Sequence, residues 1–166
     1  MQLAIWSDSH DNIPNIQKAL AYLKQRNITF MIHCGDLAAP AVIKKELGPN
    51  FNGEVHFIHG NVADRELNQK VAAEFKNITC HGDQGELAID GKKIAFNHYP
   101  EEAKKLAETG KYDVVFYGHN HIPWEETIGQ TKLLNPGTLA GMFAKATFAV
   151  YDTKTNTAEL ILLEKI

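Results

Sequence analysis

The chain has 166 residues, of which 44% are hydrophobic and 22% are charged, and this is the composition of an ordinary globular domain. Its 17 basic and 20 acidic side chains leave a formal net charge of −3, which argues against a general nucleic-acid-binding protein. No apolar run approaches the ~18 residues that a membrane span needs. We therefore expect a single domain over residues 1–166, with neither nucleic acid nor a membrane as its partner.

The first half of the chain predicts strands and helices in alternation. Three apolar runs, each followed by polar residues, have the length of buried strands. Between them apolar residues recur at helical spacing, and Asn12 and Asp64 are suitable N-caps. The expected strands are Leu3–Trp6, Ile28–His33 and Val55–Ile58, and the expected helices begin after Asn12, around Ala41–Leu47 and at Asp64. This order is typical of a parallel sheet covered by helices.

The second half predicts two hairpins around a further helix. Asp90-Gly91 lies between two strand-like segments and is a strong turn signal. A second hairpin closes the chain. The expected strands are Glu86–Ile89, Lys93–Asn97, Asp113–Tyr117, Lys132–Leu134, Thr147–Tyr151 and Ala158–Leu163, with a helix over Glu101–Glu108. We therefore expect an α/β architecture of two packed sheets with outer helices, in which the hairpins make at least one sheet mixed.

Two features predict a cytoplasmic location. The N-terminal segment MQLAIWSD has neither a positive region nor a long apolar stretch, so it does not resemble a secretory signal. The two cysteines, Cys34 and Cys80, are far apart and form no CxxC pair. We interpret both as buried free thiols of a protein in a reducing compartment.

Polar side chains that can bind metal follow five of the apolar runs. They are Asp8, His10, Asp36, Asn61, His98, His119 and His121. Ligands bind at the carboxyl ends of strands in open α/β sheets, and carboxylate, amide and imidazole ligands together suit Mn²⁺, Fe or Zn²⁺. Seven ligands are enough for two metals that share a bridging carboxylate, an arrangement that clamps an in-line phosphoryl displacement. Spacing alone does not assign each ligand to a metal.

His119 and His121 are the strongest local signal. They follow the run VVFYG, and strand geometry would put both side chains on one face. We interpret the other four histidines, which are His33, His56, His59 and His81, as structural or surface residues. His33 and His59 lie close to the motifs and are candidates to support the ligands. Trp124 and Phe143 are candidates to shape the mouth of the site, but we favour packing in the core or at its rim for both.

The order of these motifs resembles the calcineurin-like metallophosphoesterases. The motifs are Asp8-x-His10, Gly35-Asp36, Gly60-Asn61, His98 and Gly118-His119-x-His121. The later Asn135-Pro136-Gly137-Thr138 resembles a segment of the small YfcE-type phosphodiesterases. The resemblance covers nearly the whole chain and implies a four-layer αββα sandwich of two packed mixed β-sheets flanked by helices.

The resemblance also implies a role for each ligand. Asp8, His10 and His121 would hold the first metal. Asn61, His98 and His119 would hold the second. Asp36 would bridge both, and a hydroxide between the metals would attack phosphorus, with Asp36, Asn61 and His98 taking part in catalysis. Manganese is the expected metal, with Fe, Ni or Zn as alternatives. By position, Asn135 and Asp11 are candidates to accept hydrogen bonds from the ligand imidazoles.

The chain departs from the family pattern at three places. Val62 stands where many members carry a His that protonates the leaving group. Asp64 is displaced by one position from the usual acid, and we interpret it as a helix cap. His98 is followed by Tyr99-Pro100 instead of Gly, and Tyr99 is a candidate to line the pocket.

The leading function is a binuclear metal-dependent phosphodiesterase acting on a small phosphodiester, of which nucleotide-like diesters are one class. The runner-up among enzymes is a phosphomonoesterase, which the missing general acid disfavours, or a dinucleoside polyphosphate hydrolase, which the small size and the lack of an Arg-rich pocket disfavour. The alternative of another class is a catalytically weak, Vps29-like protein-interaction scaffold. The seven intact ligand positions favour the enzyme. The sequence predicts no oligomeric state.

Overall fold

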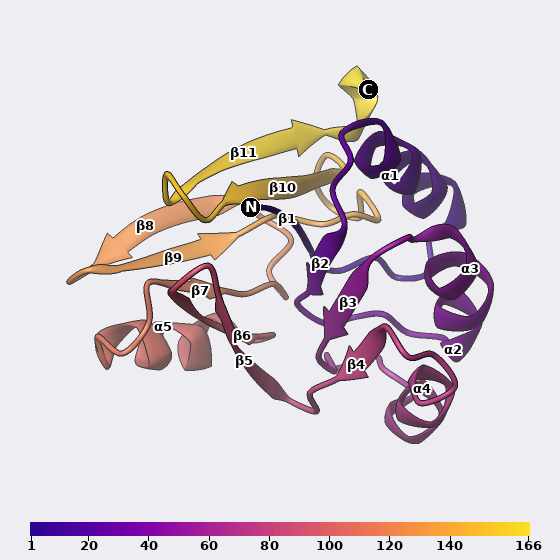
Figure 1. Cartoon of the computed structure of the whole chain (residues 1–166), viewed down its shortest axis with the longest axis horizontal. Helices are drawn as coiled ribbons and strands as arrows, with labels where there is room; N and C mark the ends of the chain where they lie inside the picture. The colour runs from indigo at the N-terminus through magenta and orange to yellow at the C-terminus, as the bar shows by residue number, and fades with distance from the viewer.

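Two β-sheets lie face to face, and helices cover the outer face of each, in the computed structural model, which describes residues 1–166 (Figure 1). The first sheet has six strands in the order β11-β10-β1-β2-β3-β4, and the second has five in the order β5-β6-β7-β9-β8. The strands are β1 (Gln2–Trp6), β2 (Phe30–His33), β3 (Glu54–Phe57), β4 (Ile78–Cys80), β5 (Gln84–Ile89), β6 (Lys92–Asn97), β7 (Val114–Phe116), β8 (Trp124–Ile128), β9 (Thr131–Asn135), β10 (Thr147–Asp152) and β11 (Thr157–Leu162).

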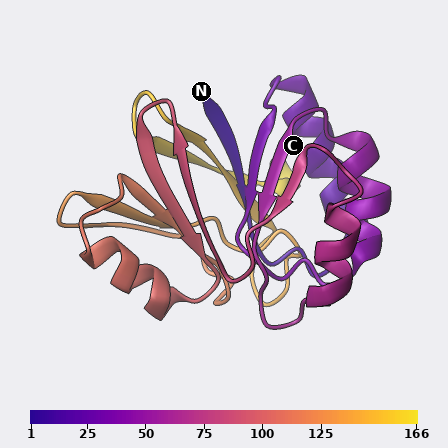
Figure 2. The ribbon, with the colours of Figure 1, turned by 60° about the horizontal axis from the view of Figure 1, so that its bottom comes forward.

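The helices are distributed unequally over the two outer faces. Figure 2 shows α1 to α4 stacked along the first sheet and α5 alone on the far side of the second. Their bounds are α1 (Ile13–Gln25), α2 (Pro40–Val42), α3 (Gly48–Asn50), α4 (Arg65–Ala72) and α5 (Pro100–Glu108). A π-helical turn, Ile43–Leu47, joins α2 to α3, and a 3₁₀ turn, Leu163–Lys165, follows β11. None of these helices combines the length and the apolar character of a membrane-spanning segment.

Three apolar layers hold this arrangement together. The alternation of side chains along each strand sends successive residues to opposite faces, so Leu3 and Ile5 of β1 enter the layer between the sheets while Ala4 and Trp6 face the helices. Ile94 and Phe96 of β6 meet them in that middle layer. Ala95 faces the third layer, under α5. The four-layer αββα sandwich with two mixed sheets is therefore confirmed.

Parallel pairing brings several strand ends to one edge. Strands β1 to β4 pair in parallel in the first sheet, and β6, β7 and β9 do so in the second. In Figure 2, β1 runs down from the N-terminus, and the loops that follow the strands gather at the lower edge of the molecule. This edge carries the side chains that the sequence singles out.

Most predicted elements are present within a residue or two. The Asp90-Gly91 hairpin joins β5 to β6, and both of its residues have positive φ, 50° and 76°, as a type I′ turn requires. The closing hairpin of β10 and β11 is present. Asp64 caps α4, because its carboxylate accepts the N–H of Leu67.

Some predictions about the fold were incomplete or wrong. Strand β8 was missed because its side chains are almost all exposed and therefore show no apolar alternation. Strand β4 was missed because only Ile78 of its three residues is buried, so no apolar run marks it. The helix expected to stop before Gly48-Pro49 continues to Asn50, since proline is tolerated in the first turn of α3. Both cysteines are free, but only Cys34 is buried, and Cys80 is partly exposed.

Candidate metal centre

The seven candidate ligands lie in loops that follow strands of both sheets. Asp8 and His10 follow β1, Asp36 follows β2, and Asn61 follows β3, all in the first sheet. The second sheet contributes the other three, which are His98 after β6 and His119 and His121 after β7. The structure brings all seven together at one edge of the sandwich.

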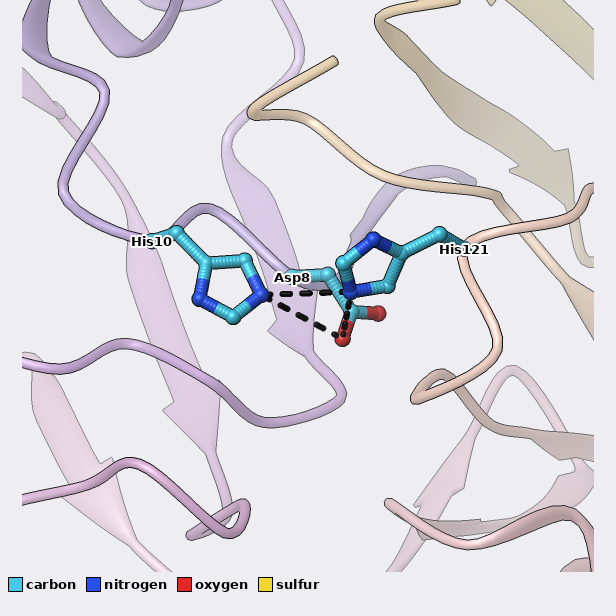
Figure 3. Close-up of side chains that lie close together, drawn as sticks. All are labelled: Asp8, His10 and His121. Atoms are coloured by element: carbon cyan, nitrogen blue, oxygen red, sulfur yellow. Dashed lines mark hydrogen bonds and ion pairs between the residues drawn. The ribbon is translucent and has the colours of Figure 1, made fainter. Parts of the chain in front are cut away.

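One group of ligand atoms comes from Asp8, His10 and His121 (Figure 3). His121 Nε2 lies 3.2 Å from Asp8 Oδ1 and 3.2 Å from His10 Nε2, and His10 Nε2 is 4.0 Å from the same carboxylate oxygen. Asp8 and His10 come from one sheet and His121 from the other, so the three atoms close a triangle across the sandwich.

A second group comes from Asn61, His98 and His119. Asn61 Oδ1 lies 3.2 Å from His98 Nε2 and 3.0 Å from His119 Nδ1, and the two ring nitrogens are 3.3 Å apart. This triangle also joins the two sheets, since Asn61 follows β3 and both histidines follow strands of the second sheet.

Asp36 lies between the two groups. Its Oδ2 is 3.6 Å from His10 Nε2 and 3.5 Å from His98 Nε2. Its Oδ1 accepts the backbone N–H of Val62 at 3.2 Å. One carboxylate therefore faces both triangles, which is the placement that a bridging ligand needs.

Backbone carbonyls orient two of the imidazoles. His98 Nδ1 lies 2.9 Å from the carbonyl of Cys34, and His121 Nδ1 lies 3.0 Å from that of Met142. A carbonyl only accepts, so both Nδ1 atoms carry the proton and both Nε2 lone pairs face the centre. The predicted acceptors were wrong, because Asn135 bonds to Gly118 and Asn120, and Asp11 accepts the N–H groups of Ala38 and Ala39.

The donor set fits divalent metal ions. Ligands about 2.1 Å from a metal are separated by roughly 3.0 Å at octahedral angles and roughly 3.4 Å at tetrahedral angles. The shortest separations within the two triangles are 3.0 to 3.3 Å. Lone pairs that converge so closely repel one another unless a cation or a shared proton lies between them, so these separations are compatible with bound metal ions.

Burial makes the carboxylates depend on nearby positive charge. Burial raises the pKa of Asp8 above its usual value. Burial also acts to raise the pKa of Asp36, but the hydrogen bond and the charge of His98 outweigh it, and that pKa is lowered. For His98, burial opposes protonation while Asp36 favours it, and the pKa is raised. A bound divalent ion would replace these protons as the source of positive charge.

The ligand loops adopt an unusual backbone conformation. Asp8, His10, Asp36, His119 and His121 all have positive φ, between 38° and 73°. Non-glycine residues rarely adopt it, and such residues cluster at functional sites. The strand argument for His119 and His121 was wrong, because β7 ends at Phe116. Both residues lie in a left-handed loop, and each belongs to a different triangle.

Two motif glycines let the loops approach closely. A Cβ at Gly60 would overlap the carboxylate of Asp36, and a Cβ at Gly118 would overlap the side chains of Ser7 and Asp8. These two glycines therefore each provide space for a carboxylate from a neighbouring loop.

A scan against known families matches residues 1–156 to the calcineurin-like phosphoesterase superfamily domain. The chain belongs to this superfamily. Its curated relatives include the phosphodiesterase MJ0936 of Methanocaldococcus jannaschii, 31% identical and matched over 99% of this chain and 100% of the relative. The phosphodiesterase YfcE of Escherichia coli is 25% identical over 84% of this chain and 80% of its own length. The chain is thus a hydrolase of the phosphodiesterase branch, and the predicted resemblance is confirmed.

Solved structures of the superfamily agree with this assignment. An archaeal phosphodiesterase shares 29% identity with a TM-score of 0.85 over 98% of this chain and 99% of its own. Vps29 of Entamoeba histolytica in complex with Zn²⁺ has a TM-score of 0.71 at 16% identity, over 98% and 99% of the two chains. The second likeness shows a common fold only. Divalent metals are characteristic of metallophosphoesterases, and the two triangles are candidate sites for them.

An open hollow of about 270 Å³ lies over the metallophosphoesterase centre. Its lining includes five of the predicted ligands, together with Asn120, Met142 and Phe143. Phe143 does not pack in the core or its rim as expected. Its side chain is 94% exposed, and its ring centroid lies 5.9 Å from that of His121. Trp124 lies elsewhere, on β8, and is 55% exposed.

Sequence reasoning missed the residues that act through their backbone. The carbonyls of Cys34 and Met142 orient ligand imidazoles, yet a carbonyl is present in every residue and has no sequence signal. His33 is a partial exception, because its position beside a motif suggested a supporting role. Its buried Nε2 lies 2.9 Å from Ser9 Oγ.

The unpartnered Nδ1 of His33 identifies its tautomer. This buried atom has no hydrogen-bond partner, and an unpaired buried N–H costs more than an unpaired lone pair. The proton is therefore on Nε2 and is donated to Ser9 Oγ, whose hydroxyl is then free to donate to the Asp36 carbonyl 3.4 Å away. His33 thus links the loop of Asp8 and His10 to the loop of Asp36.

Replacing Gly60 by Ala should shift the Asp36 loop and weaken metal binding, because the new Cβ would overlap both the carboxylate and the backbone nitrogen of Asp36. The new methyl would displace the Asp36 carboxylate, and displaced support of a ligand typically costs about 10- to 100-fold in metal affinity. Calorimetric titration with Mn²⁺ would measure this loss. Leu67→Ala, an exposed substitution on α4, is the control that should leave metal affinity unchanged. Equal affinities of the two variants would contradict the role of Gly60.

Acid should destabilise the metal-free protein in part through His33. Burial lowers the pKa of His33 from 6.5 to about 3, so the unfolded chain binds this proton first. The stabilisation that neutral His33 gives the folded protein is therefore complete above about pH 6.5. It is lost as the pH falls, and the free energy of unfolding decreases by at most ~1.4 kcal/mol per pH unit. Urea unfolding of the wild type and His33→Gln between pH 7 and pH 4 should give a shallower pH dependence for the variant. Identical slopes would refute the prediction.

Proposed function

We propose that the chain is a binuclear metal-dependent phosphodiesterase that hydrolyses small, nucleotide-like phosphodiesters. The observation that carries this proposal is the position of Asp36, whose one carboxylate oxygen lies 3.5 and 3.6 Å from imidazoles of two separate ligand triangles. Two divalent ions, manganese in our proposal and Fe, Ni or Zn as alternatives, would supply an activated water and positive charge for the phosphate oxygens.

The residues of the centre have distinct tasks in this proposal. Asp8, His10 and His121 hold one metal, Asn61, His98 and His119 hold the other, and Asp36 holds both. The Asn61 oxygen faces His98 and His119. Its amide nitrogen is therefore left to donate to a phosphate oxygen.

The leaving group receives no proton from the residue that follows Asn61. Val62 is 44% exposed beside the centre, and its side chain cannot donate a proton. General acid catalysis is typically worth 10²–10⁴-fold. Phosphodiesters with good leaving groups are therefore the favoured substrates, and simple alkyl phosphomonoesters are disfavoured.

The open hollow supports a small substrate. Its volume of about 270 Å³ lies below the range of pockets that enclose a drug-sized ligand. We propose a small-molecule phosphodiester as the partner, a single domain over residues 1–166, and a cytoplasmic location, which the free thiols Cys34 and Cys80 support.

The test is metal-dependent hydrolysis by protein stripped with a chelator. On titration with Mn²⁺, hydrolysis of bis(4-nitrophenyl) phosphate should appear and reach a plateau at about two ions per chain. Asp36→Asn should lower the rate at least ~100-fold, since it removes a ligand common to both positions. Leu67→Ala, an exposed substitution on α4, is the control that should leave the rate unchanged.

The outcome also decides between the enzyme and a scaffold. A plateau at one ion per chain would contradict the binuclear proposal while leaving a phosphodiesterase. If the protein neither binds metal nor hydrolyses the diester, the proposal is overturned and the Vps29-like scaffold is favoured.

Restoring an acid at position 62 should broaden the range of leaving groups. Val62→His places an imidazole beside Asn61, so hydrolysis of diesters with alkyl leaving groups should rise by up to ~10²-fold, and aryl diesters should gain little. The measurement is kcat for methyl 4-nitrophenyl phosphate and for a dialkyl phosphate. Each is determined for Val62→His, for the wild type and for the control Val62→Leu. A parallel change for both substrates would show that the missing His is not what limits leaving-group choice.

A further inference from the structure

Phe143 is exposed to an unusual degree for its residue type. Its side chain is 94% exposed, whereas the other seven phenylalanines are buried or partly buried. Burial of an aromatic side chain is favourable, so a ring left in water is a feature that folding alone does not explain.

The backbone holds this exposed ring in a strained conformation. Phe143 has φ of 62°, a region that bulky residues seldom occupy. Gly141, two residues earlier, is also left-handed, with φ of 73°. Residues kept in such conformations persist where the surrounding structure enforces them, and they cluster at ligand sites.

The metal centre itself fixes the position of this loop. The carbonyl of Met142, the residue before Phe143, accepts the Nδ1 proton of His121 at 3.0 Å. Before it, Ala140 donates its N–H to the carbonyl of Asp8 at 3.1 Å, and Asn12 donates to the carbonyl of Ala140 at 2.9 Å. The backbone that carries Phe143 is therefore anchored on both the ligand His121 and the ligand loop of Asp8.

The ring and the metal ligands face one hollow of mixed character. Phe143 lies 5.9 Å from the His121 ring, with an angle of 31° between the ring planes. The same hollow is otherwise lined mainly by polar groups, including Asp36 and Asn61. A ligand that fits this combination has an anionic group at the metal centre and a flat apolar group beside the ring of Phe143.

We propose that Phe143 is a specificity-determining residue that stacks on a planar aromatic group of the substrate. This rests on the proposed phosphodiesterase function and narrows its substrate class to phosphodiesters that carry an aromatic ring, such as a nucleobase or an aryl ester. The ring face of Phe143 would make a stacking contact that tolerates any planar aromatic group.

The test compares two ligands that cannot be hydrolysed, phenylphosphonate and methylphosphonate. Both bring a phosphonate to the Mn²⁺-loaded protein, and only the first has a ring. Calorimetry should show that the wild type binds phenylphosphonate about tenfold more tightly than methylphosphonate. Phe143→Ala should remove this preference with little effect on methylphosphonate, Phe143→Tyr should keep it, and the control Leu67→Ala should not alter it.

A spectroscopic variant gives an independent measurement. Phe143→Trp places an indole at the same position. 4-Nitrophenylphosphonate should quench the fluorescence of this variant more strongly than that of the wild type. The two native tryptophans lie elsewhere, since Trp6 is buried and Trp124 lies on β8. Methylphosphonate should quench neither protein.

Failure of this proposal can be distinguished from failure of the phosphodiesterase. Suppose that the protein hydrolyses diesters with Mn²⁺. The stacking role alone is then overturned if the wild type shows no preference for phenylphosphonate, or if Phe143→Ala keeps that preference. Equal weakening of both phosphonates in Phe143→Ala would show that the residue only shapes the loop, and it would also overturn the role. A wild type that neither binds phosphonates nor hydrolyses diesters would overturn both proposals.

Discussion

The structure of the candidate centre depends on the position of one carboxylate, that of Asp36. A single oxygen of this group faces an imidazole from each of two ligand triangles, so a small displacement would separate them. The residue itself has a left-handed backbone, the N–H of Val62 holds its other oxygen, and the missing side chain of Gly60 provides its space. The loop of Asp36 and the loop after β3, which carries Gly60 and Val62, therefore together keep this side chain in place.

The arrangement of strands explains how such loops can meet. Parallel pairing directs the ends of β1, β2 and β3 to one edge, and β6 and β7 of the opposite sheet end beside them. Rigid strands supply the coarse placement, and the left-handed residues after them turn the ligand side chains inward. Precise placement thus comes from local strain that the packed layers behind the site support.

The sequence predicted the layers and the members of the site but not the contacts within it. Apolar runs that end in Asp8, Asp36 and His119 carry a pattern that reflects burial, and burial decides strand positions. Strand β8 has no buried face, so no pattern marks it. The orientation of His98 and His121 depends on the carbonyls of Cys34 and Met142, which only the folded chain brings near. The position of Phe143 likewise follows from a loop conformation, and a lone aromatic residue in a sequence is more often part of a core.

Each ligand triangle draws on both sheets, and this has a consequence for the stability of the whole fold. Asp8 and His10 of the first sheet meet His121 of the second, and Asn61 of the first meets His98 and His119 of the second. A metal ion in either triangle would therefore act as a cross-link between the halves of the sandwich. By mass action, an ion at 100 times its dissociation constant adds about 2.7 kcal/mol to the free energy of unfolding. The supply of metal would thus set not only the rate of the reaction but also how long the two sheets stay together.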